Sequence, residues 1–444
     1  MKEIFVISDL HIGGAATADN SDRGFRICTH TDVLSDFIYR LCDRKKAFIE
    51  LVINGDMVDF LAERDFAAFT IDPKMAVQKL KNIVEREFQF FDSLQLFLAT
   101  GHQLTILLGN HDIELALPEV QAYLRQVLKA ERKNFNFILT DTPYIVGNGA
   151  VLIEHGNRYD EWNWVDYGAL HKLMAQQARG EKISDFRPPK GSRMVEMVIN
   201  PVKEKYRFID LLKPETQAVL PILLALEPSS KNKISTILSI YTNFRGTEER
   251  SEDQVLDEEL YKVLGDEVEG FKEYAEVPTT TRETSERGTW EVVTGFVDLL
   301  LRKDNSRLEK RLPALHKALS VLQNDQSFNP AQESLKEYLE AAQRLSEQGF
   351  KYIIFGHTHF ARNVELSNGA RYFNAGTWAD LMQIPINILN ETDYSTAMQL
   401  LEKFMNDLLI NQVAQYAIFK PTYVHIELDN SGDVVNIDLK EYEC

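Results

Sequence analysis

Short apolar runs alternate with helical patterns over the first 160 residues of the chain. The apolar runs have the length and the β-branched content of strands, and they lie at residues 4–7, 51–53, 104–108 and 151–153. Between the second and third runs, apolar residues from Val77 to Leu98 recur at spacings of three and four, which predicts a helix that Pro73 opens and Gly101 closes. Strand, helix and strand in this order predict an α/β fold with buried strands.

The pattern changes near Glu161, where strand signals become sparse and helical periodicity dominates. After Ser346 a strand pattern returns at residues 352–355, and the chain ends in a predicted β-hairpin of residues 423–428 and 434–439. We therefore expect one α/β core that is interrupted by a mainly helical insertion or cap. The predicted parts are residues 1–160 and 347–444 for the core and residues 161–346 for the insertion.

Composition is that of an ordinary globular protein, with 44% hydrophobic and 26% charged residues among 444, so a disordered or collagen-like chain is excluded. The charge is unusual, because 49 Lys and Arg face 67 Asp and Glu, which gives a net charge of −18. Such a chain has no long-range attraction to phosphate backbones, which argues against broad nucleic-acid binding. Nearly half of the excess lies in residues 245–276, with 12 acidic and 4 basic residues, a pattern typical of a solvated helical face.

Cysteine content and hydropathy bear on the compartment. The three cysteines, Cys28, Cys42 and Cys444, form no C-x-x-C pair, which favours a reducing compartment and argues against disulfides or a cysteine zinc site. The N-terminus lacks the apolar region of a signal peptide, and the apolar stretch at residues 218–226 is too short to cross a bilayer. The sequence thus predicts a soluble cytoplasmic protein.

Polar residues that could bind a metal follow each predicted core strand. They are Asp9 and His11, Asp56 and Asp59, Asn110 and His111, His155, and His357 with His359. Since ligands of open α/β sheets bind at the carboxyl ends of strands, we expect these segments to converge. Carboxylates, imidazoles and a carboxamide, without thiolates, suit hard-to-borderline divalent or trivalent metals. The candidate ligands exceed the needs of one ion but suit two ions that share a carboxylate.

The ordered set D-x-H, G-D-x-x-D, G-N-H-D, H-G and G-H-x-H resembles the calcineurin-like metallophosphoesterase superfamily. The resemblance covers the two outer segments and implies a two-sheet αββα sandwich with the helical segment as an insertion. The opening at residues 8–14 is most similar to bacterial and archaeal branches that include UDP-2,3-diacylglucosamine hydrolases. Those enzymes commonly have Arg where this chain has His111, so their substrate is not carried over. The insertion has no motif that we can assign to a family.

The resemblance also implies a dinuclear metal centre. Asp9, His11, Asp56 and His359 would hold one ion, and Asp56 would bridge to a second ion held by Asn110, His155 and His357. Manganese is the favoured metal, with iron or zinc as alternatives. Such a pair hydrolyses a phosphoester by in-line attack of a hydroxide that bridges the ions. The charge of the ions would also let an acidic protein hold a phosphate.

Two further residues match catalytic positions of the superfamily. His111 matches a histidine that is not a ligand and that stabilises the transition state or protonates the leaving group. Asp59 matches the carboxylate with which the protein phosphatases of the superfamily orient this histidine. Those phosphatases have an Arg directly after it, whereas this chain has Phe60, which disfavours a protein-phosphatase activity.

The sequence leaves several alternatives open. The substrate is expected to be a small-molecule phosphomonoester, phosphodiester or pyrophosphate, and the alternatives are a nuclease of the same superfamily or a non-catalytic metal-binding scaffold. The sequence does not give the oligomeric state. Other polar residues, expected to be solvated, to line the cleft or to pack, are Asp19, Arg23, Arg26, His30, Arg158, Asp160, Trp162, His171, His316 and His425.

Overall fold

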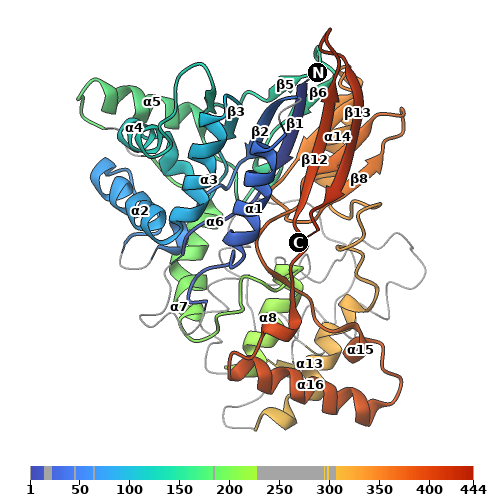
Figure 1. The fold of residues 1–444 in the computed structure, drawn as a ribbon. Helices are drawn as coiled ribbons and strands as arrows, with labels where there is room; N and C mark the ends of the chain where they lie inside the picture. Colours follow the sequence, from blue (N-terminus) through green and yellow to red (C-terminus); the bar gives the residue numbers. More distant parts are fainter. Residues whose placement is uncertain are drawn as a thin grey trace, which may run out of the picture. The chain divides into compact units, whose positions relative to one another are not determined.

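The computed structural model describes residues 2–14, 23–44, 47–63, 66–183, 186–227, 295, 298–299 and 307–443. These residues form two compact units (Figure 1). The first unit consists of Met1–Asn200, Ser327–Asp380 and Phe419–Cys444, and the second of Pro201–Gln326 and Leu381–Ile418. The acidic run at 245–276 and Asp19 lie outside the described residues. The units are separated at other places than the expected boundaries 160/161 and 346/347, which remain a prediction.

The first unit contains a mixed six-stranded sheet in the order β13-β12-β1-β2-β3-β4. In this order the strands are Val434–Glu441, Thr422–Leu428, Lys2–Ile7, Phe48–Asn54, Gln103–Leu107 and Phe135–Ile138. Strands β1 to β4 are parallel, as the βαβ pattern predicted. The hairpin predicted at the end of the chain is β12 and β13, and its first strand pairs antiparallel with β1.

A second sheet has five strands in the order β5-β6-β7-β9-β8. In this order the strands are Tyr144–Val146, Val151–Ile153, Tyr352–Phe355, Arg371–Asn374 and Arg362–Glu365. Strands β6 and β7 are parallel neighbours, with Val151 opposite Tyr352. This pairing joins the two parts of the sequence that the expected insertion separates.

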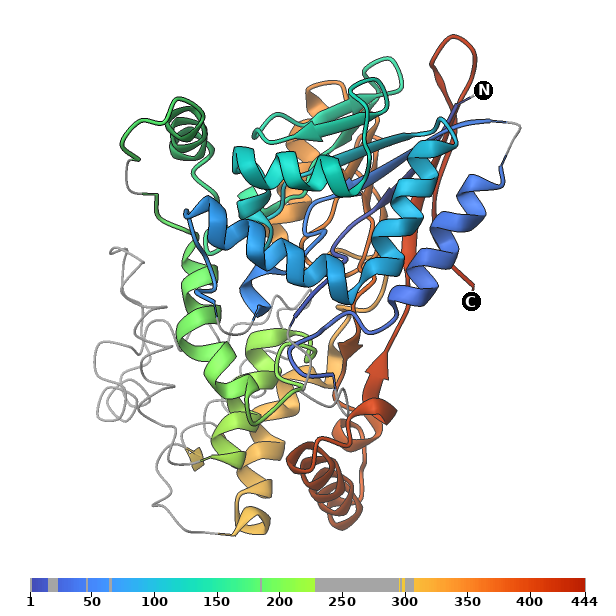
Figure 2. The same cartoon turned by 60° about the vertical axis from the view of Figure 1, so that its left-hand side comes forward.

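The two sheets pack face to face around one apolar core. Inward-facing residues of both sheets form this cluster, among them Ile4, Val52, Ile153, Ile354 and Ile426. Helices α1 (Thr31–Cys42) and α3 (Phe88–Ala99) lie on the outer side of the first sheet (Figures 1 and 2). Helix α14 (Lys336–Glu347) packs on the outer face of the second sheet through Tyr338 and its neighbours. The architecture is therefore the αββα sandwich that the sequence resemblance implied.

The long helix expected between Pro73 and Gly101 is in fact two helices, α2 (Pro73–Arg86) and α3. Asp72 caps α2 by accepting hydrogen bonds from two backbone N–H groups, with Pro73 at the first helical position. The break falls at Glu87, whose ψ of 34° is not helical and whose carboxylate accepts a hydrogen bond from Thr31. A continuous apolar stripe in the sequence conceals such a break, since both helices pack against the same layer.

The remaining helices described in the first unit are α4 (Pro118–Val127), α5 (Tyr167–Ala178) and α6 (Lys190–Met194). A π-helical turn (Val195–Ile199) links α6 to α7 (Asn200–Lys203), of which Pro201–Lys203 belong to the second unit. The described residues of the second unit are mainly helical, with a two-stranded ribbon of β10 and β11. Its elements are α8 (Glu215–Leu226), α13 (Leu312–Leu319), α15 (Ile386–Leu389), α16 (Tyr394–Leu409), β10 (Leu381–Met382) and β11 (Ala417–Ile418). In the part of the chain that the structure describes, no helix combines the length and apolar character needed to cross a membrane.

Candidate metal centre

The turns that follow β1, β2, β3, β6 and β7 meet at one end of the two sheets. The backbone N–H of His11 donates to the carbonyl oxygen of Asp56 at 2.9 Å, and the N–H of Asp59 donates to Ile12 at 3.0 Å. Two glycines permit the close approach. A Cβ atom at Gly109 would overlap Asp56, and one at Gly356 would overlap Ser8 and lie 2.7 Å from Asp9 Oδ2. The sharp turns therefore bring polar side chains of distant segments into contact.

Five of the predicted metal ligands have a left-handed backbone conformation. They are Asp9, His11, Asp56, His357 and His359, with φ between 46° and 67°. For residues other than glycine this conformation costs about 1–2 kcal/mol each. Such backbone strain persists only where the surrounding structure stabilises it, and it is found most often at functional sites. The strained residues therefore indicate that this group of turns forms a functional site.

The first cluster of potential ligand atoms consists of Asp9, His11 and His359. The Nε2 atoms of His11 and His359 lie 3.1 Å apart, and each lies within 4 Å of Asp9 Oδ1. Ligand atoms that bind one ion at about 2.0–2.3 Å are separated by about 3–3.5 Å. The spacings of His359 to His11 and to Asp9, 3.1 and 3.5 Å, fit a common metal, and that of His11 to Asp9 is slightly longer, at 3.9 Å. Within the described residues Asp9 Oδ1 is buried and accepts no hydrogen bond. The donor set therefore fits a cation.

The second cluster consists of Asp56, His155 and His357. His155 Nδ1 lies 2.8 Å from the carbonyl oxygen of Asn54, which can only accept, so this nitrogen carries a proton. His155 Nε2 lies 3.3 Å from Asp56 Oδ2 and 3.3 Å from Asn110 Oδ1. If His155 carried no proton on Nε2, this nitrogen would face the two oxygens, Asp56 Oδ2 and Asn110 Oδ1, with lone pairs on all three atoms. A cation among them would remove that repulsion.

Asp56 lies between the two clusters. Its Oδ2 is 3.7 Å from His11 Nε2 on one side and 3.3 Å from His155 Nε2 on the other. Its second oxygen, Oδ1, accepts a hydrogen bond of 2.8 Å from the backbone N–H of His111. The structure therefore brings all seven predicted ligands together, in two groups that adjoin at Asp56. Their roles as ligands remain a prediction.

Burial and mutual charge set the protonation of this site. Burial raises the pKa of Asp9, whereas in Asp56 the positive charge of His155 and His111 overcomes burial and holds the pKa well below its usual range. Burial, reinforced by His111, lowers the pKa of His11 to about 4. His155 behaves oppositely, because Asp56 outweighs burial and raises its pKa to about 10. Metal binding at His155 would thus displace a proton.

His111 and Asp59 lie beside the first cluster. His111 Nδ1 is 3.2 Å from Asp59 Oδ1, and the His111 ring meets the His11 ring edge-on at 4.7 Å between centroids. The side chain of His111 is 24% exposed, against 1% for His11. Phe60, at the position of the phosphatase Arg, is fully buried and starts a 3₁₀ turn (Phe60–Ala62) that Asp59 caps. The geometry agrees with the pairing of Asp59 and His111, whose catalytic role remains a prediction.

Several residues that support the site had no role in the sequence analysis. Ser8 Oγ donates to Asp9 Oδ2 at 2.5 Å, and the buried Asp112 accepts the N–H groups of Met57 and Gly109 at 2.8 and 2.7 Å. Burial, together with Asp56, raises the pKa of Asp112 to about 8. Asp112 belongs to the G-N-H-D motif, so the sequence contained a signal for it. Ser8 carries no comparable signal beyond its position before Asp9.

Within the described residues 23–30 of the loop after β1, the polar side chains are paired more closely than the sequence suggested. Arg23 and His30 lie 3.0 and 3.1 Å from the carboxylate of Asp380, which is only 2% exposed, and Arg26 donates to the backbone of Arg23. The expectation was wrong because Asp380, 350 residues later in the sequence than His30, supplies a buried partner. The side-chain hydrogen bond to Asp380 raises the pKa of His30.

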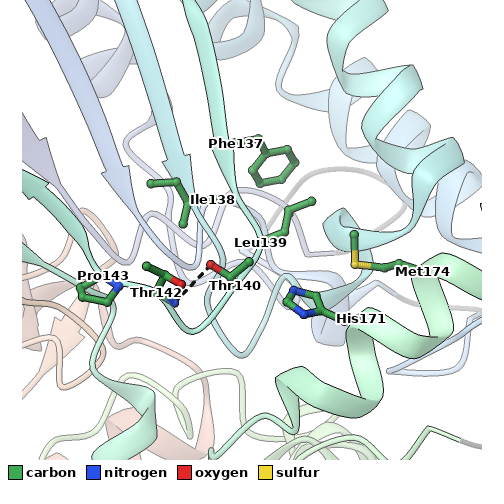
Figure 3. Close-up of a pocket in the computed structure, with 8 residues that line it drawn as sticks. All are labelled: Phe137, Ile138, Leu139, Thr140, Thr142, Pro143, His171 and Met174. Carbon is green, nitrogen blue, oxygen red and sulfur yellow. Dashed lines mark hydrogen bonds between the residues drawn. The ribbon is translucent and has the colours of Figure 1, made fainter.

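Of the three remaining histidines, His316 and His425 contact other side chains, and His171 is exposed. His316 meets the ring of Tyr394, His425 lies 2.9 Å from Glu3, and His171 lines a cavity of about 530 Å³. Figure 3 shows this cavity between the segment Phe137–Pro143 and the α5 residues His171 and Met174. A smaller pocket shares Thr140 and Thr142 with it and reaches His155 and Arg158.

Comparison with known proteins identifies the first half of this architecture. The family model of the calcineurin-like phosphoesterases matches residues 2–197, which include every predicted ligand except His357 and His359. None of the curated proteins matches the chain. The narrower resemblance to UDP-2,3-diacylglucosamine hydrolases is not confirmed by these comparisons. Residues 2–197 therefore form a calcineurin-like phosphoesterase domain, and this domain indicates a metal-dependent hydrolase of phosphoester bonds.

Proposed function

We propose that the chain hydrolyses a small-molecule phosphoester with a pair of metal ions. The observation that carries this proposal is the pair of ligand clusters that adjoin at Asp56. Asp9, His11, Asp56 and His359 would hold one ion, and Asp56, Asn110, His155 and His357 the other. When bound, such a pair activates a water molecule and neutralises the charge of a phosphoryl group. Manganese is the favoured metal, and iron or zinc are the alternatives.

The protein residues hold the reacting groups in place. The proton on His155 Nδ1 is directed to Asn54, which leaves Nε2 as the ligand atom. The low pKa of His11 keeps its imidazole neutral, as a metal ligand must be. Asp56 remains ionised and places one oxygen between the clusters. Such fixed geometry avoids reorganisation during the reaction.

His111 is the proposed proton donor or transition-state stabiliser. Its Nδ1 faces Asp59, so Nε2 is the nitrogen that would contact a substrate. It is also more exposed than His11, as contact with a substrate requires. Proton transfer from His111 to the leaving oxygen would avoid the expulsion of an alkoxide. Asp59 would orient the ring and stabilise its protonated form.

Two observations support a small molecule over a polymer or a phosphoprotein. The net charge of −18 opposes a long nucleic-acid footprint. In addition, the buried Phe60 offers no positive charge where the protein phosphatases of the superfamily have one.

Metal content and turnover test this proposal together. We expect the purified protein, loaded with Mn²⁺, to hold about two ions per chain and to cleave bis(p-nitrophenyl) phosphate or p-nitrophenyl phosphate until a chelator is added. Asp56→Ala should lower the content of both ions, whereas Asp166→Ala, at the exposed cap of α5, should not. An unchanged metal content in Asp56→Ala would refute the bridging role. Metal binding without any turnover would favour a scaffold, and salt-sensitive cleavage of nucleic acid would favour a nuclease.

A further inference from the structure

Two predicted ligands of the second ion are linked by side chains that hold no metal themselves. His357 Nε2 lies 3.1 Å from Asp160 Oδ2. The same carboxylate oxygen accepts a hydrogen bond of 2.7 Å from Asn163 Nδ2. Asn163 Oδ1 in turn accepts a hydrogen bond of 3.3 Å from Asn110 Nδ2. His357 and Asn110 are therefore joined through Asp160 and Asn163, which belong to the segment that directly follows His155.

The contact with Asp160 selects the ligand atom of His357. A carboxylate can only accept, so Nε2 of His357 carries the proton and Nδ1 keeps its lone pair for a metal. A carboxylate on the far nitrogen of an imidazole also raises its strength as a ligand. His155 uses the opposite arrangement, with Nδ1 bound to Asn54 and Nε2 directed at Asp56. The two imidazoles of this cluster are thus fixed by different partners.

The contact with Asn163 orients the amide of Asn110 in the same way. Since the Asn110 nitrogen donates to Asn163, its oxygen faces His155 Nε2 at 3.3 Å. An amide in the opposite orientation would present N–H groups to the cation. Asn163 therefore determines which end of Asn110 can serve as a ligand.

The segment that carries Asp160 and Asn163 is itself held firmly. The buried Asn157 donates to the backbone oxygen of Asn163 at 2.8 Å, and the N–H of Trp162 donates to Asp160 Oδ1 at 2.8 Å. Gly191 donates its N–H to Trp162, and a Cβ atom at Gly191 would overlap the amide oxygen of Asn163. The segment thus has the rigidity that a positioning role requires.

From this arrangement we propose that Asp160 and Asn163 are positioning residues for the second metal ion. They hold His357 and Asn110 with their ligand atoms toward the ion, and both of these residues are ligands proposed for the second ion only. This inference rests on the proposed function, because it requires two ions. It follows that loss of either residue weakens the second site selectively.

Titration of the metal-free full chain with Mn²⁺ tests the proposal, with calorimetry and the Mn²⁺ EPR spectrum as readouts. We expect wild type to bind two ions and to show the spectrum of a coupled pair. Asp160→Ala and Asn163→Ala should weaken the second ion about 10- to 100-fold and leave the first within about twofold, so that an isolated-ion spectrum appears at low Mn²⁺. Asp160→Asn keeps the shape of the side chain and one hydrogen-bond acceptor, so its affinity for the second ion should fall less than that of Asp160→Ala. Asp166→Asn is the matched control from the same segment, and it should bind as wild type.

The outcomes separate the two proposals. If wild type binds fewer than two ions, the dinuclear function itself is wrong. If wild type binds two ions and the variants bind both with unchanged affinity, the positioning role is overturned while the function stands. Equal weakening of both ions in Asp160→Asn, with an unfolding midpoint near that of wild type, would also overturn the selective role. The isosteric Asp160→Asn variant keeps the test valid if Asp160→Ala does not fold.

Discussion

His111 is the residue at which binding and catalysis can be separated. It follows the proposed ligand Asn110, but its ring faces Asp59 and is partly exposed. We expect His111→Ala to lower kcat about 10²- to 10⁴-fold, the usual contribution of a positioned acid or base, while metal content stays near two ions per chain. His171→Ala, which changes a cavity residue, is the control and should keep most of the turnover. Loss of metal together with activity would make His111 a ligand or a structural residue instead.

Residues of the site differ in how well their roles can be predicted from the sequence. Residues that follow a strand and belong to a rare motif, such as Asp9 or His357, can be recognised from the sequence, because the motif's order and spacing can be read directly from it. The roles of Asp160 and Asn163 cannot be recognised in this way, because hydrogen bonds to His357 and Asn110, 197 and 53 residues away, leave no local pattern. The same reason explains the error for Arg23, since its partner Asp380 comes from the other end of the core.

Among the elements, the turn after β7 depends on Gly356. A Cβ atom there would overlap Ser8 and press on Asp9 Oδ2, so Gly356→Ala must separate the turns after β1 and β7. We expect the free energy of unfolding to fall by about 1–3 kcal/mol and Mn²⁺ affinity to fall with it, because His357 and His359 follow directly. Denaturant unfolding and metal titration measure the two effects. Gly168→Ala, in helix α5, should be neutral or slightly stabilising, because the added Cβ atom would only touch Asp166 Oδ1, at 3.4 Å. Equal behaviour of the two variants would contradict the argument.

Strands and the terminal hairpin were predicted more reliably than helix ends. Buried strands leave compact apolar runs, and β1, β2, β3, β6 and β7 all lie at the predicted runs. The break at Glu87 went unseen because it depends on a tertiary contact with Thr31. In the same way, residues 381–418 group with the second compact unit although they follow the core strands in sequence. Both the helix break and the grouping of residues 381–418 depend on tertiary packing partners, which cannot be read from the local sequence.

At the scale of the whole molecule, an acidic chain and a phosphate substrate are compatible. The net charge of −18 includes carboxylates that the site itself requires, and 12 acidic residues lie in the segment 245–276. Bound cations determine the local field of such a centre more strongly than the net charge does. The charge therefore limits the size of the substrate's footprint and does not exclude phosphoester chemistry.

The stability of the metal-free protein should depend on pH through His155 and His11. The folded-state pKa of His155 is raised to about 10, so its stabilising contribution is complete below its unfolded value near 6.5 and is lost as the pH rises toward 10. The pKa of His11 is lowered to about 4, so the unfolded chain binds its proton more tightly, and stability increases between pH 4 and 6.5. The pKa of Asp112, raised to about 8, opposes the His11 branch, because the folded chain binds the proton of this carboxyl more tightly than the unfolded chain does. The clear prediction of these shifts is therefore a decline in stability above pH 6.5.

Bound metal should counteract the loss of stability above pH 6.5. Mn²⁺ replaces the proton on His155, so the stabilisation that Mn²⁺ provides should increase as the pH rises from 6.5 to 9. Over the same range, the free energy of unfolding of the metal-free protein should decrease. Urea unfolding across this range, with excess chelator or excess Mn²⁺, measures both branches. His155→Gln removes the titrating ring, and its metal-free profile should lose the decline above pH 6.5 beyond what general charge repulsion gives. A wild-type profile that matches His155→Gln between pH 6.5 and 9 would show that Asp56 does not hold a proton on His155, and the electrostatic account of the second cluster would then be wrong.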